Sequence, residues 1–282
     1  MHTLRSLGLR TDLAVLGRSA EIEARDGYLV VRSPRNPRFH WGNLLVFPAA
    51  PQPGDGSRWE TLFESEFAAS PAVTHRTFTW DTVDADSVGA ARSEFVSRGY
   101  TLEDTIVLTA PVSRIEATAR ANREVQVIPL ATGDPSHEAF WDAVVEIQVA
   151  GREPRFDEAG HRAFSVARQR DLRQLFAAGN GTWYVAVDPT SERVVASCGI
   201  VARDGLGRYQ SVDTIESYRR RGIASRLVAE AARHAAETFA VRELVILAET
   251  HYHALPLYES LGFEPTEHLY GVSRSGPAPP GG

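Results

Sequence analysis

The sequence predicts an α/β (α+β) fold divided into two domains. Strand-like and helix-like segments alternate along most of the chain, as in a sheet flanked by helices. A length of 282 residues favours about two domains. The hydrophobic content of 43% and the charged content of 23% are those of an ordinary folded protein.

The first half alternates strands with helices of aromatic character. We expect strands over residues 27–33, 43–49, 72–81 and 105–110, and helices over 58–69 and 86–100. Trp59, Leu62, Phe63 and Phe67 recur at helical spacing. Prolines and glycines mark loops at 34–42 and 51–57. Gly99 ends the second helix, because glycine tolerates the left-handed cap conformation.

The second half has clearer boundaries. A polar stretch at 113–127 precedes it, so we predict domains over 1–122 and 123–274 and a disordered Pro/Gly-rich tail over 275–282. The hydrophobic pattern predicts helices over 134–151, 156–179, about 222–239 and 253–261, and strands over 182–189, 193–203, 208–215, 243–249 and 268–274.

Composition excludes several classes of function. A net charge of −6 argues against a nucleic-acid partner. The single cysteine, Cys198, rules out an intrachain disulfide and favours a reducing compartment. The N-terminus has no continuous apolar segment of the signal-peptide type, and no stretch approaches the roughly 18 apolar residues of a membrane span. We therefore expect a cytoplasmic protein without a membrane partner.

The stretch "SYRRRGIASRL" (217–227) predicts an anion site at a helix N-terminus. It follows a predicted strand and opens a helix whose apolar residues recur every four positions. First-turn N–H groups are unpaired and carry the positive end of the helix dipole. Gly222 allows an anion to approach this backbone, and arginine side chains add charge-assisted bonds to phosphate oxygens. The pattern indicates a pyrophosphate.

Two common phosphate motifs are absent, and a third is present. There is no Gly-Lys-Ser/Thr of a P-loop, and "GLGRYQ" (205–210) has too few glycines for a dinucleotide fingerprint. Instead, Arg219, Gly222 and Ala224 form Arg-x-x-Gly-x-Ala. This motif, together with "ELVILAETHYHALPLYESLGF" (243–263), resembles the coenzyme-A-binding region of the GCN5-related N-acetyltransferase (GNAT) superfamily. The resemblance covers about 124–274. It departs from the family at His251, where members often carry asparagine.

The resemblance implies a central mixed, splayed β-sheet flanked by helices, with acetyl-CoA between two parallel strands, here 208–215 and 243–249. The strand backbone would pair with the pantetheine arm, and the next loop would hold the pyrophosphate. The implied cofactor-binding residues are Val212, Thr214, Ile215, Arg219, Arg220, Arg221, Gly222, Ile223, Ala224 and Ser225. The implied reaction is direct attack of an amine on the thioester in a ternary complex, with Tyr258 as the general acid.

The general base is less well defined by the sequence. Glu249, at the end of the second splayed strand, is our candidate, although an ordinary strand-end carboxylate is an equally valid reading. Asp213 and Ile215 share one face of the first strand and Thr214 takes the other, so the face that meets the substrate stays open. His251 and His253 have no third ligand at convincing spacing, so we predict no metal.

The first half carries an echo of the second. "FVSRGYTLEDTIVLTA" (95–110) repeats the helix–glycine–strand order of "YESLGFEPTEHLYGVS", which favours a tandem with a degenerate GNAT-like first half. Three functions follow for the whole chain: an N-acetyltransferase acting on a primary amine of a small molecule or peptide, a non-catalytic acyl-CoA-binding or sensing protein, and an interaction protein. We expect a monomer or homodimer.

Overall fold

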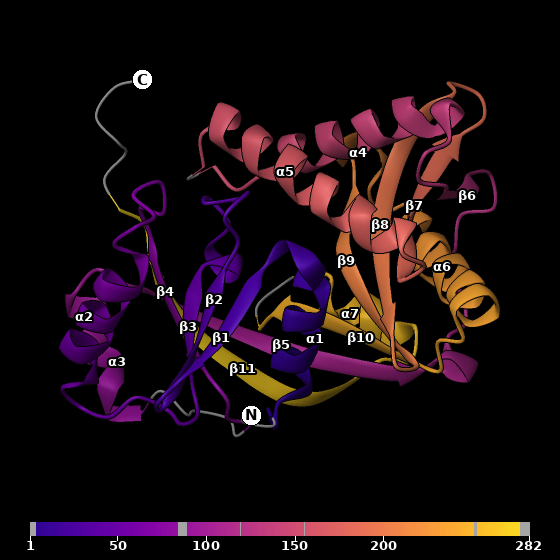
Figure 1. Ribbon diagram of the computed structural model, residues 1–282. Helices are drawn as coiled ribbons and strands as arrows, with labels where there is room; N and C mark the ends of the chain where they lie inside the picture. Colours follow the sequence, from indigo (N-terminus) through magenta and orange to yellow (C-terminus); the bar gives the residue numbers. More distant parts are fainter. Residues whose placement is uncertain (1–3, 84–88, 119, 155, 251–252, 277–282) are drawn as a thin grey trace. The chain divides into compact units, whose positions relative to one another are not determined.

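The computed structural model describes residues 4–83, 89–118, 120–154, 156–250 and 253–276 (Figure 1). Contacts divide the chain into two compact units. Unit 1 consists of Met1–Val107, Ala248–Thr250 and Thr266–Gly282, and unit 2 consists of Leu108–Leu247 and His251–Pro265. The chain first passes between them inside strand β5 (Thr101–Pro111). Each unit combines helices with a run of paired strands.

Unit 1 is built on a mixed sheet. Strands β1 (Glu21–Arg25), β2 (Tyr28–Arg32) and β3 (Leu44–Phe47) pair antiparallel in sequence order. Strand β3 then pairs parallel with β4 (Arg76–Trp80), and helix α2 (Asp55–Phe67) makes the crossover between them. Most of β11 (Glu264–Arg274) also belongs to this unit and pairs antiparallel with β4, with Gly271 opposite Thr79.

Aromatic packing holds unit 1 together. Trp59 on α2 stacks on Phe47 of β3 with ring centroids 3.8 Å apart. Helix α3 (Arg92–Ser97) contributes Phe95, which is 1% exposed and contacts Trp59 and Phe78. The predicted helical spacing of Trp59, Phe63 and Phe67 is confirmed, because all three lie in this core.

Helix α1 (Leu7–Leu16) is fixed in unit 1 by two carboxylates at its N-terminus. Glu267 of β11 accepts hydrogen bonds from the Ser6 hydroxyl and from the N–H groups of Leu7 and Gly8, at 3.0 to 3.2 Å. Asp81 accepts from the N–H groups of Arg5 and Ser6 at 2.8 Å. Negative charge is favourable at this end of a helix.

We expect Glu267→Ala to destabilise the protein by about 1–3 kcal/mol, because the buried donors at the start of α1 lose a charged acceptor. Urea unfolding followed by tryptophan fluorescence measures the change. Glu264→Ala, on the same strand, is the control, since Glu264 is exposed and pairs with the exposed Arg114. Equal effects of the two substitutions would contradict the anchoring role of Glu267.

Unit 2 contains an ordered run of strands, β10-β9-β8-β7-β6. Strands β6 (Gln126–Leu130), β7 (Gly181–Asp188), β8 (Arg193–Arg203) and β9 (Leu206–Thr214) pair antiparallel in sequence order. Strand β10 (Glu243–Glu249) then pairs parallel with β9. Helix α6 (Ile223–Phe239) connects β9 to β10, and α7 (Leu255–Ser260) follows β10.

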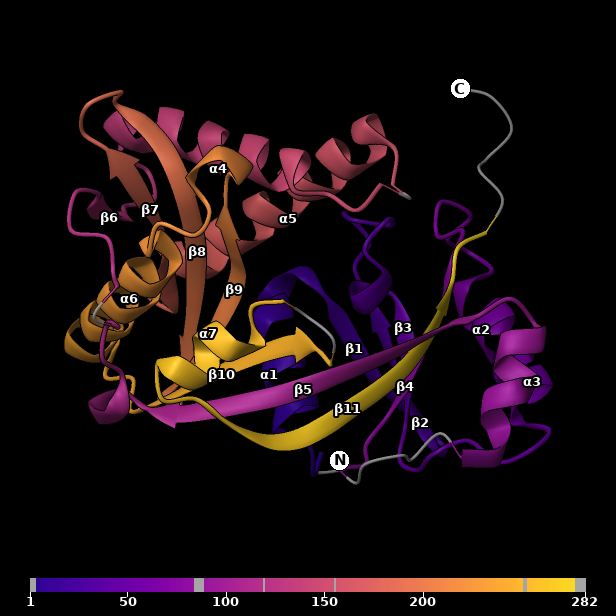
Figure 2. The ribbon, with the colours of Figure 1, turned by 180° about the vertical axis from the view of Figure 1, so that it is seen from behind.

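Helices cover both faces of the unit 2 strands. Figures 1 and 2 show α4 (Glu138–Ala150) and α5 (Glu158–Ala177) on one face and α6 on the other. Two neighbouring residues of β9 mark these faces. The Tyr209 hydroxyl donates to the Val228 carbonyl of α6 at 2.8 Å, whereas Gln210 accepts from Arg168 of α5 at 3.3 Å. Successive side chains of a strand point to opposite faces, as this pairing requires.

The structure differs from the predicted organisation in three respects. Helix α1 and strand β1 were not predicted, because their charged residues hide the apolar pattern. We predicted a domain boundary between residues 122 and 123. In the structure, the chain first crosses from unit 1 to unit 2 between Val107 and Leu108. The last strand, placed in the second domain by chain order, pairs with β4 of unit 1. Hydrogen bonding between distant strands decides this last point, and no local pattern reports it. Of the predicted tail, residues 277–282 lie outside the described residues.

Candidate active site

The two parallel strands of unit 2 separate part-way along their length. Strands β9 and β10 pair only at Leu206–Arg208 with Glu243–Val245, although the structure describes every residue of both strands. Strand β9 also carries a bulge, because the register with β8 shifts between Ser197 and Gly199 and Ser211 has a φ of 41°. A bulge bends and twists its strand. The predicted splayed pair is therefore present, and β9 presents an open backbone edge beyond Arg208.

Two of the three predicted backbone positions on this edge have the required direction. The Ile215 N–H donates to the Val195 carbonyl of β8 at 3.0 Å, so it is not available to a pantetheine amide. Backbone groups of alternate residues point to opposite edges of an antiparallel ladder. Val212 and Thr214 consequently direct their polar groups away from β8, toward the open edge. The Thr214 carbonyl accepts from Arg219 Nε at 3.1 Å.

The predicted anion site lies at the start of α6. Gly222 is the N-cap with a φ of 73°, and no side chain caps the helix. The first turn contains no acidic residue. No described residue supplies an acceptor for the N–H groups of Arg220 to Ala224, and the side chains of Arg219, Arg220 and Arg221 are exposed. Unpaired backbone N–H groups and positively charged side chains thus lie together at the start of α6, and its first turn holds no carboxylate.

Gly222 is required for a reason that the sequence did not reveal. A Cβ atom at this position would overlap with the carbonyl oxygen of Arg120, in the segment between β5 and β6. The same segment bonds to Gly222 directly, because the Asn122 N–H donates to its carbonyl at 3.0 Å. Glycine therefore allows close contact with the protein's own backbone, and the earlier explanation by approach of a ligand alone was incomplete.

The segment between β5 and β6 also changes the interpretation of Ser225. Ser225 is 2% exposed, and its hydroxyl lies 3.2 Å from the Thr118 N–H and 3.1 Å from the Thr118 hydroxyl. Its hydroxyl already has partners, so it serves the packing of this segment rather than standing ready for a phosphate. Ile223 is buried in the core, so only its backbone faces the site.

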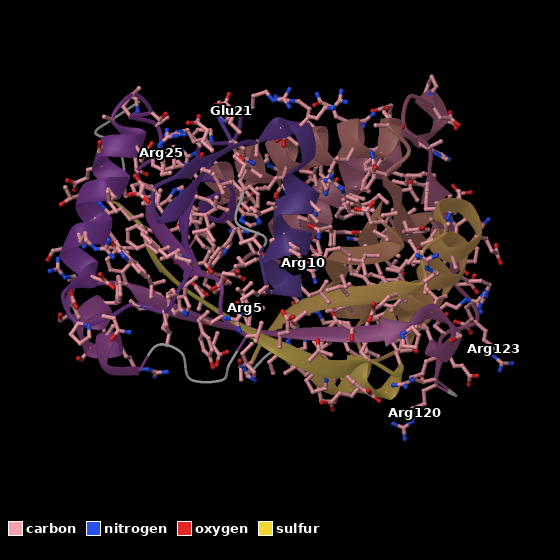
Figure 3. All side chains as sticks on the ribbon, turned by 60° about the horizontal axis from the view of Figure 1, so that its bottom comes forward. Arg5, Arg10, Glu21, Arg25, Arg120 and Arg123 are labelled. Carbon is pink, nitrogen blue, oxygen red and sulfur yellow. The ribbon has the colours of Figure 1, made fainter. Side chains whose placement is uncertain are left out.

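Two arginines of this segment were missed by the sequence analysis. Arg120 and Arg123 are exposed on either side of Asn122, the residue bonded to Gly222. Figure 3 shows their side chains extending away from the ribbon. Their separation from the motif by about a hundred positions hid them, because only the fold brings this segment to the start of α6.

Tyr258 lies on α7, packed against Phe263 with ring centroids 6.2 Å apart, and is 3% exposed. The pKa of Tyr209 is raised above its ordinary value by burial first and then by the charges of neighbouring groups, Tyr258 among them. Tyr209 directly follows Arg208, the last residue of β9 that pairs with β10. The rings of Tyr258 and Tyr209 both pack against Phe263, with centroids 6.2 and 6.1 Å from its own, so Tyr258 lies near the start of the split.

Glu249 is exposed at the end of β10, in the part of that strand assigned to unit 1. His251, the departure from the family pattern, lies outside the described residues. Among the residues that the structure describes, no group of three histidine, cysteine or carboxylate side chains could hold a metal. Across the described part of the chain, no helix is long and apolar enough to cross a membrane.

Comparison with known families agrees with this geometry. Residues 179–265 match the family model described as an acetyltransferase (GNAT) domain. This part of the chain, less than half of it, is similar to a GNAT domain. The match contains the split strands, the start of α6 and Tyr258, and it stops short of the segment that carries Arg120 and Arg123. No curated protein matches the chain.

Solved structures extend the GNAT fold over the whole chain. A GCN5-related N-acetyltransferase from Kribbella flavida is 18% identical, with a TM-score of 0.64 over 99% of this chain and 97% of that one. A conserved protein of unknown function from Staphylococcus epidermidis is 13% identical, with a TM-score of 0.68 over 90% and 93%. A tandem GNAT protein from the clavulanic acid pathway is 14% identical, with a TM-score of 0.57 over 99% and 91%. The predicted tandem fold is confirmed.

The degenerate half repeats the architecture of the GNAT domain. Within unit 1, β3–α2–β4 is a parallel crossover, as β9–α6–β10 is in unit 2. The predicted echo is also present. Helices α3 and α7 are each followed by a glycine with positive φ, Gly99 at 81° and Gly262 at 98°, and then by an 11-residue strand.

The start of α2 in the first half differs from the start of α6. Gly54 is its N-cap with a φ of 93°, and the order Gly-Asp-Gly-Ser at 54–57 corresponds to Gly-Ile-Ala-Ser at 222–225. Pro51 stands three positions before Gly54, where the motif at α6 has Arg219. Here Glu94 of α3 accepts from the Gly54 N–H at 2.7 Å. A carboxylate of the protein thus occupies the position where unit 2 leaves its donors open.

Proposed function

We propose that this chain is a cytoplasmic acetyl-CoA-dependent N-acetyltransferase that transfers an acetyl group to a primary amine of a small molecule or peptide. The observation that carries the proposal is the uncapped start of α6, rich in arginine, beside the open edge of β9. Unpaired backbone donors with surrounding positive charge suit a pyrophosphate. The open edge suits an amide-containing arm that adds to the sheet like a strand. The residues present therefore fit coenzyme A.

Each group of residues has a defined task in this proposal. The N–H groups of Arg220 to Ala224 would bind the pyrophosphate, and Arg219, Arg220 and Arg221 would add charge. Val212 and Thr214 would pair with the pantetheine arm through their backbone. Bound acetyl-CoA supplies an activated acetyl group. Transfer forms a C–N bond and breaks a C–S bond, so the amine must lose a proton and the thiolate must gain one.

Tyr258 is our proposal for the general acid, because a hydroxyl is suited to protonating the leaving thiolate. The sequence offers Glu249, exposed at the end of β10, as one candidate for the base. The structure offers a second candidate, Asp213 on β9, and the two carboxylates are alternatives for this role. Arg120 and Arg123 add charge beside Gly222 and are suited to the further phosphate of coenzyme A.

The deciding experiment is calorimetric titration with acetyl-CoA, followed by detection of free thiol with glucosamine, spermidine and a tripeptide with a free N-terminus. Binding together with amine-dependent thiol release supports the proposal. Binding without release for any amine would favour the non-catalytic acyl-CoA-binding function. No binding at millimolar acetyl-CoA would refute the assignment of the site.

Simultaneous replacement of Arg219, Arg220 and Arg221 by alanine should weaken acetyl-CoA binding by about 30-fold or more, equivalent to about 2 kcal/mol, because charge-assisted bonds to phosphate are lost. The salt dependence of binding should fall as well. Calorimetry at two ionic strengths measures both. Arg233→Ala is the matched control, since Arg233 is exposed on the same helix and pairs with Glu230. An unchanged affinity of the triple variant would remove the arginines from the site.

A further inference from the structure

The sheet-facing side of α5 is unusually polar. Ser165, Arg168, Gln169 and Leu172 have the i, i+3, i+4, i+7 spacing of one helical face. All four are buried, and only Leu172 is apolar. A helix that packs on a sheet normally presents an apolar stripe. Packing on the sheet therefore does not by itself explain the polar residues on this side of α5.

Several buried polar atoms on this side of the sheet have no partner. They are the Ser165 hydroxyl, both the Oε1 and Nε2 atoms of Gln169, and the hydroxyl of Ser197 on β8. These residues are 1%, 4% and 0% exposed. Each such group costs about 1–3 kcal/mol when it lacks a hydrogen bond, so each calls for an explanation. Hydroxyl or amide groups of a bound molecule would be suitable partners for them.

The strand register places Ser197 and Asp213 on the face of the sheet that α5 covers. Arg168, next to Gln169, bonds to Gln210, and Gln210 pairs with Gly199. Ser197 is two residues from Gly199, so it lies on the same face of β8, roughly 7 Å along the strand. Beyond the bulge, Ser197 pairs with Asp213. Asp213 thus lies on the α5 face of β9, between the cofactor-edge residues Val212 and Thr214. The register therefore assigns Asp213 to the face that α5 covers.

Asp213 has an environment unlike that of a surface carboxylate. Burial raises its pKa to about 6, although the charge of Arg219 opposes the rise. The charged group beside it is Arg219, from the loop after β9, and the uncharged Cys198 thiol of β8 also lies close. On α5, Arg168 bonds to Gln210, three residues before Asp213 on β9. Helix α4 buries Trp141, Val144 and Ile147, which do not titrate. A carboxylate with this pKa is ionised at neutral pH and remains able to accept a proton.

We propose that Asp213 holds the acceptor amine and accepts its proton, and that Gln169, Ser165 and Ser197 recognise hydroxyl or amide groups of that acceptor. The preferred acceptor is therefore a small amine carrying several hydroxyl or amide groups, as in an amino sugar, and not an alkyl or aryl amine. The inference rests on the proposed acetyl transfer and defines its substrate class. In the transfer, the amine nitrogen bonds to the acetyl carbon, its proton passes to Asp213, and the C–S electron pair leaves with the thiolate.

The buried position of these groups requires α5 to shift when the acceptor enters. The helix is suited to this, because its polar side gains little from contact with the sheet. Hydrogen exchange at 158–177 should therefore slow when acetyl-CoA and an acceptor bind together. This measurement reports on the site without depending on turnover.

The test compares D-glucosamine with cyclohexylamine, which has the same ring size without hydroxyls. The wild-type protein should prefer glucosamine by at least about 100-fold in kcat/KM, because a site built for hydroxyls rejects an analogue that leaves them unpaired. Gln169→Leu should reduce this preference at least about 10-fold while acetyl-CoA affinity is unchanged. Transfer to both amines at equal rates would overturn the proposal but not the acetyltransferase function. Failure to bind acetyl-CoA would instead overturn the proposed function.

Asp213→Asn should lower kcat/KM by about 100-fold or more and remove the limb of the pH profile near pH 6. Its folding gives an independent readout. Since the pKa of Asp213 is raised on folding, the wild-type protein loses stability as pH rises from about 4 to about 6. The variant lacks this loss, so its Tm relative to wild type should increase between pH 4 and pH 7. A retained pH limb or a pH-independent Tm difference would overturn the role of Asp213.

Discussion

Replacement of Gly222 by valine should weaken acetyl-CoA binding severely. The residue has a φ of 73°, which valine adopts only with strain, and a Cβ atom would collide with the Arg120 carbonyl. Relief of the collision requires the segment at 120–122 or the first turn of α6 to move. Either movement displaces the N–H groups that we assign to the pyrophosphate. We expect a loss of affinity of at least about 100-fold, because about 3 kcal/mol of hydrogen bonding to a charged ligand is lost.

A variant at a second glycine measures the effect of backbone strain without a steric overlap. Gly133, also in unit 2, has a φ of 83°, and a Cβ atom there would meet nothing within 4 Å. Gly133→Val therefore carries the backbone strain without the overlap, and it should lower the Tm by a few degrees while leaving acetyl-CoA affinity intact. Calorimetry and thermal unfolding of both variants give the comparison. Normal binding by the Gly222 variant would show that the start of α6 is not the cofactor site.

The elements of unit 2 were predictable because their signals are local. The spacing of Ile223, Leu227, Ala231 and Ala235 predicts a helix with one buried side, and all four are buried in α6. The apolar run 243–249 coincides with β10. These patterns depend only on residues within one or two turns of a helix or within one strand, where hydrophobic spacing dictates the structure.

The contributions of distant segments were not predictable. Arg120 and Asn122 reach Gly222 from about a hundred positions away, and β11 joins β4 across almost 200 positions. No spacing rule reports contacts of this range, since they depend on how the whole chain folds. Asp213 illustrates an intermediate case. The sequence showed that Asp213 and Thr214 point to opposite faces of β9. The face on which Asp213 lies could be assigned only from the bulge and from its pairing with Ser197.

The two halves should differ completely in cofactor binding, with one acetyl-CoA bound per chain. At the start of α6 the donors are open and arginines surround them. At the start of α2, Glu94 accepts from Gly54, and Asp55 places a second carboxylate in the first turn, where it accepts from the Gln52 N–H at 2.8 Å. A pyrophosphate approaching α2 would have to displace one carboxylate and remain beside another, which reverses the electrostatic advantage of the helix dipole.

The triple arginine variant turns this difference into a test. If α2 were a second site, the variant would still bind one equivalent of acetyl-CoA with wild-type affinity, whereas we expect no such site in calorimetry.

Glu94→Ala should destabilise the protein by about 1 kcal/mol, because the Gly54 N–H loses its acceptor. It should nevertheless retain a stoichiometry of one, since Asp55 stays in place. We therefore expect the second half to provide the cofactor site, whereas Glu94 already bonds the corresponding donor in the first half.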